Sequence, residues 1–231
     1  MIPSLSIVIP VHNESAAIPQ LLIRLEAALS VMKLPQAECL IVDDGSTDES
    51  PQLLREAARN YAFLKPIIRP ERKGKSAALL AGFNAAEGEY IVTLDGDLQN
   101  DPMDLPILLA VLEEQNADVV VGWRVIRHDP IQRQIFSRCY NYMLGKIFGV
   151  PLHDHNCGMK IFRKNILSSL ALHGEWHRYF MVLAHHAGYR CAEAQISHYP
   201  RPYGRSRYGL FRYVEIVRDV AMLLMRGTAH R

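Results

Sequence analysis

The sequence lacks the features that mark secreted, membrane-spanning or disulfide-stabilised proteins. Its 4 cysteines (Cys39, Cys139, Cys157 and Cys191) are widely separated and form no C-x-x-C pair, which indicates reduced thiols in a cytosolic protein. No run approaches about 18 uncharged apolar residues, so we expect no transmembrane helix. No basic segment precedes the first apolar run, and we therefore expect no signal peptide.

A strong net charge and the common nucleotide-binding fingerprints are also missing. The net charge of +2 over 231 residues is too small to indicate a nucleic-acid partner. The carboxylates nevertheless concentrate in residues 1–122, and the arginines and histidines in residues 123–231, which indicates an anionic ligand or surface near the second half. No G-x-G-x-x-G occurs, and Arg69 stands where a Walker motif ending at residues 74–76 would need glycine. These absences disfavour a Rossmann oxidoreductase and a P-loop NTPase.

The first half of the chain alternates between apolar runs and helical spacings. Apolar, β-branched runs predict strands over residues 5–10, 38–43, 63–69, 89–95 and 117–122. The segments between them predict helices that begin near residues 15, 48, 75 and 103. Strands that alternate with helices predict βαβ units, and hence an α/β fold with a mostly parallel sheet flanked by helices.

The pattern changes after Trp123. The second half predicts a helix over 131–149, a strand over 156–162, a helix over 176–187, a strand over 189–196, a basic loop over 198–208 and a last helix over 209–226. With 49% apolar residues, the chain can form one good-sized domain. We expect 1–122 and 123–208 to be two halves of that domain, and 209–231 to hold a C-terminal amphipathic helix.

The chain is organised around the acidic end of the strand predicted over 89–95. Asp95 and Asp97 flank Gly96, and Gln99 follows. Ligands of open α/β sheets bind at the carboxyl ends of strands, and hard oxygen ligands suit Mg²⁺ or Mn²⁺. Gly96 leaves room for a backbone or a ligand to approach closely. The alternative is a strand end followed by an ordinary Asp-Pro turn.

Motifs along nearly the whole chain resemble those of the inverting glycosyltransferases of family 2. They lie at residues 7–14, 43–46, 74–79, 95–102, 122–124, 156–160, 174–179 and 200–209. The Asp-x-Asp-Leu-Gln of residues 95–99 resembles the branch of dolichol- and polyprenyl-phosphate sugar synthases. Two positions depart from the usual pattern, since Gly96 replaces the commoner alanine and His12 an aromatic tyrosine.

The resemblance implies a GT-A fold and a UDP- or GDP-linked sugar as the donor. It implies a nucleotide site formed by Pro10, His12, Glu14, Val42, Asp43 and Asp44. Lys75 and Gly96, which lie in matching motifs, are also assigned to the donor site.

The resemblance also implies a metal site and a closing loop. Asp97 and Gln99, with Asp95 as a third ligand, would hold Mg²⁺ or Mn²⁺ against the diphosphate, where the ion stabilises the leaving group. Arg201 and Arg207 would close over the diphosphate on a mobile loop.

The implied acceptor is a polyprenyl phosphate, undecaprenyl or dolichyl. Because this phosphate is already an ionised nucleophile, the transfer needs cations rather than a strong base, and arginine suits phosphate recognition. The motifs place Arg124, Arg133 and Ser137 at the acceptor phosphate. The implied catalytic residues are Asp97, Arg124, Arg133, Ser137 and Arg201.

Two other functions fit the same fold. Transfer to a soluble saccharide or protein acceptor would need a carboxylate base, for which Asp154 or Glu175 are candidates. A catalytically silent scaffold that binds nucleotide sugars is the second, although the intact residues 95–99 argue against it.

Two predicted helices are suited to a membrane surface. Residues 131–149 and 209–226 combine arginines with large aliphatic and aromatic side chains, as helices in the headgroup plane do. We expect a peripheral protein at the cytoplasmic face of the membrane, and otherwise a cytoplasmic one. The alternative is that these helices pack on the core, on a second copy in a homo-oligomer or on a membrane-protein partner.

Overall fold

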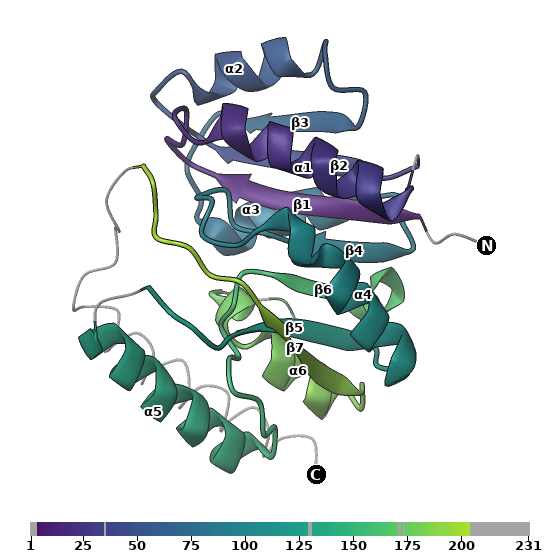
Figure 1. Cartoon of the computed structure of the whole chain (residues 1–231), viewed down its shortest axis with the longest axis vertical. Coiled ribbons are helices and arrows are strands. Elements are labelled where there is room, and N and C mark those ends of the chain that lie inside the picture. The colour runs from purple at the N-terminus through teal and green to yellow at the C-terminus, as the bar shows by residue number, and fades with distance from the viewer. Residues whose placement is uncertain (1–3, 35, 129–130, 171, 173, 204–231) are drawn as a thin grey trace.

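The computed structural model describes residues 4–34, 36–128, 131–170, 172 and 174–203, and these form a layered α/β fold (Figure 1). Seven strands make one sheet in the order β3-β2-β1-β4-β6-β5-β7. The strands are β1 (Leu5–Val11), β2 (Glu38–Asp44), β3 (Leu64–Arg69), β4 (Tyr90–Thr93), β5 (Val119–Arg124), β6 (Lys160–Arg163) and β7 (Cys191–Ile196).

The predicted mostly parallel sheet is confirmed, with one antiparallel strand. β1 runs parallel to β2 and β4, β2 to β3, and β5 to β7, whereas β6 runs antiparallel to both of its neighbours. β2 is buried at every position, as expected of a strand covered on both faces. The strands of both halves thus belong to one sheet, and its centre carries the core.

Helices lie on both faces of the sheet, and one helix, α5, stands beside it. They are α1 (Ile18–Met32), α2 (Ser50–Ala57), α3 (Lys75–Ala85), α4 (Leu105–Glu114), α5 (Ile131–Phe148) and α6 (Phe180–His186). α1 and α4 cover the face turned toward the viewer in Figure 1, and α3 packs behind β1 and β2. On the α3 side, Phe162 of β6 packs between Phe83 and Phe180, with ring centroids 5.5 and 4.8 Å away.

α5 stands beside the sheet and has a small core of its own. Tyr140, Leu144 and Phe148 of this helix pack with Tyr179 and Val182. Much of the rest of α5 is exposed, including Ile131 and Ile135. In the part of the chain that the structure describes, no helix has both the length and the hydropathy needed to cross a membrane.

Several predicted boundaries were wrong, and each has a local cause. The strand predicted over 156–162 is β6 over Lys160–Arg163, because residues 156–159 form a turn whose Gly158 carbonyl accepts from Thr93 Oγ1 at 2.7 Å. The helix predicted over 176–187 is a 3₁₀ turn, η3 (Trp176–Arg178), followed by α6. Two further 3₁₀ turns are η1 (Pro102–Asp104) and η2 (Lys164–Ser169).

The predicted C-terminal amphipathic helix and Arg207 lie outside the described residues, as does the side chain of Arg133 within α5. All four cysteines are free thiols, as predicted; Cys39 and Cys157 are buried, whereas Cys139 is exposed.

Candidate active site

The carboxyl ends of β1, β2 and β4 lie side by side and bring the predicted donor residues to one edge of the sheet. In Figure 1 the segment after β7, residues 197–203, runs along this edge. Its backbone meets the acidic loop, where Tyr199 N donates to Gln99 O at 2.9 Å, and it reaches the end of β1 through an ion pair of Arg201 with Glu14. The edge is therefore enclosed by a segment from the far end of the sequence.

The two aspartates at the end of β2 build the loops around them. Both oxygens of Asp43 accept from Ser46 N, at 3.0 and 3.2 Å. Asp44 accepts from Arg69 Nη1 at 2.7 Å and from the backbone N–H groups of Lys73 and Gly74 at 2.9 and 2.7 Å. Asp44 thus holds the segment that leads into α3, and with it the start of α3 at Lys75.

Asp95 is embedded among cations. Lys75 Nζ donates to its Oδ1 at 2.5 Å. Gly158 lies against its other oxygen so closely that a Cβ at Gly158 would collide with it. Burial alone would raise the pKa of Asp95, but the charges of Lys75, Lys160 and Arg124 outweigh burial and lower that pKa. Asp95 is therefore ionised and held in one orientation.

Asp97 is in the opposite electrostatic situation. Burial and the negative charge of Asp95 raise the pKa of Asp97, and the nearby Arg201 only partly offsets them. Arg201 Nη2 lies 2.7 Å from Glu14 Oε1 and 3.4 Å from Asp97 Oδ2. A divalent cation beside Asp97 would relieve the charge that burial and Asp95 make unfavourable.

Val42 and Gly96, which the sequence assigned to the donor site, both contact other parts of the protein. The side chain of Val42 is fully buried and faces α3 at Gly82. The space left by Gly96 is taken by the protein itself, since a Cβ there would lie 2.6 Å from Val11 Cγ1. Both residues therefore shape the sheet edge through packing. Pro10 and His12 lie half-buried at the end of β1.

The predicted acceptor residues form a second cluster. Arg124, at the end of β5, donates two hydrogen bonds to Asp154, from Nε to Oδ2 at 2.7 Å and from Nη2 to Oδ1 at 3.0 Å. Although burial would raise the pKa of Asp154, Arg124, Arg127 and Lys160 lower it. Ser137 of α5 accepts from Arg127 Nη1 at 2.7 Å. Arg124 also lowers the pKa of Asp95, so the charges of this cluster influence the acidic loop after β4.

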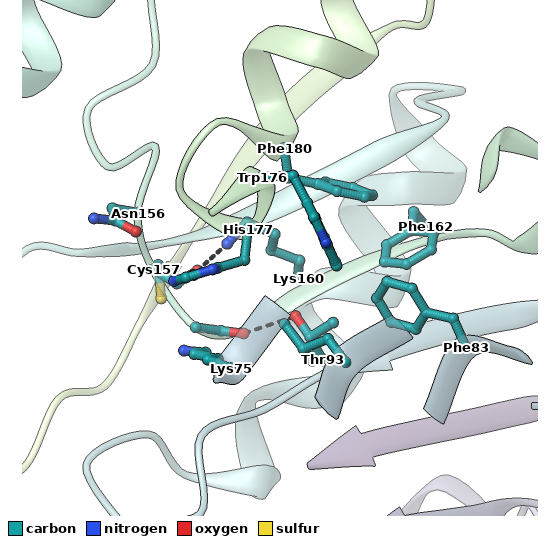
Figure 2. A pocket seen from close by; sticks show the side chains of 12 residues that line it. Lys75, Phe83, Thr93, Asn156, Cys157, Lys160, Phe162, Trp176, His177 and Phe180 are labelled. Atoms are coloured by element: carbon teal, nitrogen blue, oxygen red, sulfur yellow. Dashed lines mark hydrogen bonds between the residues drawn. The ribbon is translucent and has the colours of Figure 1, made fainter. Parts of the chain in front are cut away.

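A small cavity is lined in part by Lys75, the lysine that donates to Asp95 (Figure 2). Its volume is about 20 Å³, room for roughly one water molecule. Lys75, Lys160 and His177 contribute its polar wall, and aromatic rings close the opposite side. Lys160 Nζ donates to the Cys157 carbonyl, and burial lowers the pKa of this lysine to about 8. Lys160 thus places a buried positive charge beneath the acidic loop.

His177 connects η3, in which it lies, to the start of α3. Its Nδ1 lies 2.8 Å from Ser76 Oγ and 3.6 Å from Glu175 Oε2. Both partners meet the same ring nitrogen, whereas a hydrolytic triad needs the serine and the carboxylate on opposite nitrogens. The arrangement therefore anchors Lys75 rather than activating Ser76.

The donor set at the acidic loop fits a hard divalent cation that keeps some water. Asp97 and Gln99 offer oxygen ligands at the sheet edge, whereas the charges of Lys75, Lys160 and Arg124 already offset that of Asp95. Among the described residues, no three His, Cys, Asp or Glu side chains converge as a complete protein-made metal site. The residues present suit Mg²⁺ or Mn²⁺ shared with a ligand phosphate.

Some residues of the site were missed from the sequence. Arg127 resembles an ordinary loop arginine until α5 brings Ser137 to it. Lys160 stands in a short strand, and its burial follows only from the central place of β6 in the sheet. His198, which contacts the acidic loop, lies in the predicted basic loop but was not singled out there.

Comparison with known proteins identifies the family. Residues 6–171 match the family described as Glycosyl transferase family 2, and the chain belongs to this family. The chain is 39% identical, over 97% of its length, to the dodecaprenyl-phosphate galacturonate synthase of Rhizobium johnstonii, of which it covers 68%. It is 36% identical, over 96% of its length, to the undecaprenyl-phosphate 4-deoxy-4-formamido-L-arabinose transferase of Yersinia pestis, of which it also covers 68%.

Solved structures confirm the fold predicted from the motifs. Glucosyl-3-phosphoglycerate synthase from Mycobacterium tuberculosis superposes with a TM-score of 0.69 at 19% identity, covering 97% of this chain and 80% of that one. A mannosyltransferase from Pyrobaculum calidifontis, solved with GDP-Man and Mn²⁺, gives a TM-score of 0.58 at 20% identity, covering 87% of this chain and 59% of that one.

Proposed function

We propose that the protein transfers one sugar from a nucleoside-diphosphate sugar to a polyprenyl phosphate, with inversion at the anomeric carbon. The observation that carries this proposal is the juxtaposition of an acidic donor edge, at Asp97, with an arginine cluster around Arg124 and Arg127. Two anionic substrates can meet there. The names of the similar proteins, which act on dodecaprenyl and undecaprenyl phosphates, support this acceptor class.

The donor would lie along the ends of β1 and β2, with its diphosphate toward Asp97 and Gln99. Mg²⁺ or Mn²⁺ bound there would neutralise charge that develops on the departing nucleoside diphosphate. Arg201 supplies a further positive charge from the 197–203 segment, on the donor side of Asp97. Lys75 holds Asp95 ionised and oriented at the end of β4, next to the place where the sugar would lie.

The acceptor phosphate needs orientation rather than activation. Arg124 and Arg127 lie where a second phosphate would be drawn toward the donor, and Arg133 and Ser137 complete the proposed acceptor set on α5. Neither Asp154 nor Glu175 is well suited to act as the carboxylate base that a soluble hydroxyl acceptor would need. The ion pair with Arg124 lowers the pKa of Asp154, and Glu175 pairs with Arg178 at 3.5 Å.

The test is release of nucleoside diphosphate from a panel of UDP- and GDP-sugars in the presence of Mn²⁺. We expect release only when undecaprenyl phosphate is present, and loss of release when the metal is chelated. Release that requires a soluble glycan instead would identify the other acceptor class. Binding of a nucleotide sugar without turnover across the panel would favour the scaffold function.

We further propose that α5 and the loop before it rest on the cytoplasmic face of the membrane. Ile126 and Ile131 are 72% and 73% exposed, and Ile135 is 57% exposed. Arg138 and Lys146 lie on the same helix and suit anionic headgroups. This surface adjoins Arg127, so a lipid-borne phosphate would enter the site from it. A second copy or a membrane-protein partner is the alternative occupant.

The double variant Ile126→Asp/Ile131→Asp is expected to lower binding to anionic liposomes by at least about tenfold. Each isoleucine would otherwise gain roughly 1.5–3 kcal/mol by leaving water. Co-sedimentation with vesicles measures the partition. Ile23→Asp is the matched control, because Ile23 is 60% exposed on α1, away from this surface. Equal binding of both variants and the wild type would contradict the proposal.

A further inference from the structure

Asn141 is a buried residue of α5 whose side-chain amide bonds to the backbone on both sides of Asp154. Its Nδ2 donates to His153 O at 2.8 Å, and its Oδ1 accepts from His155 N at 3.3 Å. Asn141 is only 4% exposed. Because a carbonyl needs a donor and an N–H group needs an acceptor, these two partners fix which way the amide faces. α5 thereby holds the loop of residues 153–155 at two points that bracket Asp154.

The bracketed carboxylate determines the orientation of Arg124. Asp154 is itself buried and accepts two hydrogen bonds from Arg124. A second contact ties the loop to the sheet, since His153 N donates to Glu193 Oε2 of β7 at 2.7 Å. A planar guanidinium that makes two bonds to one carboxylate keeps a single orientation relative to it. The orientation of Arg124 therefore depends on the loop that Asn141 holds.

The same amide lies one helical turn after Ser137. The two residues are four positions apart and therefore share one face of α5, the helix that stands beside the sheet in Figure 1. Asn141 Nδ2 lies 3.5 Å from Ser137 Oγ, which accepts from Arg127 Nη1 at 2.7 Å. Asn141 thus joins two parts of the proposed acceptor cluster, Arg124 from β5 and Ser137 from α5.

We propose that Asn141 is a positioning residue for the acceptor phosphate, which holds Arg124, through Asp154, at the spacing from Ser137 that this phosphate requires. The inference rests on the proposed function. A phosphate bound between two elements depends on their separation, and a misplacement of about 1 Å can cost about 100-fold in rate. The donor and its metal, which are proposed to bind at the ends of β1, β2 and β4, should not depend on this amide.

The first test is Asn141→Leu, which keeps a side chain of similar length but removes both hydrogen bonds to the loop. We expect the KM for undecaprenyl phosphate to rise about tenfold, as the loss of one to two hydrogen bonds would give. The KM for the nucleotide sugar, and Mn²⁺ binding to the UDP-bound protein, should match the wild type. Asn141→Ser leaves space for a bridging water, so it keeps the test open if the leucine variant fails to fold. It should raise the acceptor KM by a smaller factor.

Leu144→Ala is the control for a role in stability alone. Leu144 is fully buried on the same helix and packs in its small core with Tyr179 and Val182. Removing its side chain should lower the melting temperature while leaving the amide of Asn141 and the acceptor KM unchanged. If this variant raised the acceptor KM as much as Asn141→Leu at a similar melting temperature, Asn141 would only stabilise α5, and the inference would be overturned.

A double variant tests whether Asn141 acts through Asp154. If it does, Asn141→Leu/Asp154→Asn should raise the acceptor KM no further than Asp154→Asn alone, because both changes remove the same constraint on Arg124. Two effects that multiply would show that Asn141 acts by another route and would contradict the proposal.

The orientation of Arg124 can also be measured without any substrate. Its side-chain Nε–H donates to Asp154, so this proton should exchange slowly with water in an NMR experiment, and Arg124→Lys identifies its signal by the loss of that signal. We expect exchange about tenfold faster in Asn141→Leu and near the wild-type rate in Leu144→Ala. Unchanged exchange or an unchanged acceptor KM in Asn141→Leu would overturn the inference. If the wild type shows no turnover that depends on lipid phosphate, the proposed function fails instead, while the exchange rate still decides whether Asn141 holds Arg124.

Discussion

Asp97→Asn is expected to reduce sugar transfer by about 10³-fold while leaving the protein folded. Burial and the charge of Asp95 both raise the pKa of Asp97, so the protein itself compensates the negative charge of this carboxylate poorly. An amide cannot supply that charge to a divalent cation. Nucleoside diphosphate release, measured at saturating Mn²⁺, checks the prediction.

The same substitution should raise the stability of the metal-free protein at neutral pH. A raised pKa means that the folded state holds the proton more tightly than the unfolded state. The wild type therefore loses stability as pH rises from the ordinary value of 3.8 through the raised pKa of Asp97. Asparagine does not titrate, so the advantage of the variant should be small near pH 4 and complete at pH 7.

Thermal unfolding at the two pH values, in chelator, measures this difference. Asp101→Asn is the matched control in the same loop, because asparagine can keep the hydrogen bond that Asp101 accepts from Met103 N at 3.1 Å and loses only the long, 3.7 Å ion pair with Arg24. An Asp97→Asn protein that retained turnover would remove the metal from the mechanism. One that unfolded more easily at pH 7 than the wild type would contradict the electrostatic account.

Arg124→Met is expected to destabilise the protein by about 3–5 kcal/mol, because it leaves the carboxylate of Asp154 buried and unpaired. The side chains of Arg124 and Asp154 are only 15% and 3% exposed, and they share two hydrogen bonds. Urea unfolding measures the loss. Activity should also fall, since the same guanidinium belongs to the proposed acceptor cluster.

The double variant Arg124→Met/Asp154→Asn separates the two effects. Removing the second charge relieves the buried carboxylate, so most of the stability should return. Transfer should remain impaired, and the KM for the lipid phosphate should stay high. If activity returned together with stability, Arg124 would have only a structural role.

Much of the sheet could be predicted from the sequence because its strands are long apolar runs separated by helical spacing. β1 and β2 illustrate this, since nearly every residue in them is buried. The direction of β6 could not be predicted. Its four residues carry no sign of orientation, and it enters the sheet between β4 and β5 after a long excursion through α5.

The part of the site that lies at the strand ends could also be predicted from the sequence. Motifs at strand ends placed Pro10, Asp44 and Asp95 at one edge of the sheet, because neighbouring parallel strands end there. The partners that set their charge come from elsewhere: Arg201 meets Glu14 across 187 positions of sequence. Short-range patterns contain no information on such contacts, so the different roles of Asp95 and Asp97 emerged only from the fold.

The central claim is the attachment of a single sugar to a lipid phosphate, and the product itself tests it most directly. Purified protein would be incubated with the active nucleotide sugar, Mn²⁺ and a short-chain polyprenyl phosphate, and the lipid product analysed by mass spectrometry and proton NMR. We predict a mass increase of one sugar residue on the phosphate, with the anomeric configuration opposite to that of the donor. A product with retained configuration, with several sugars, or with the lipid phosphate unmodified while nucleoside diphosphate accumulates would contradict the account.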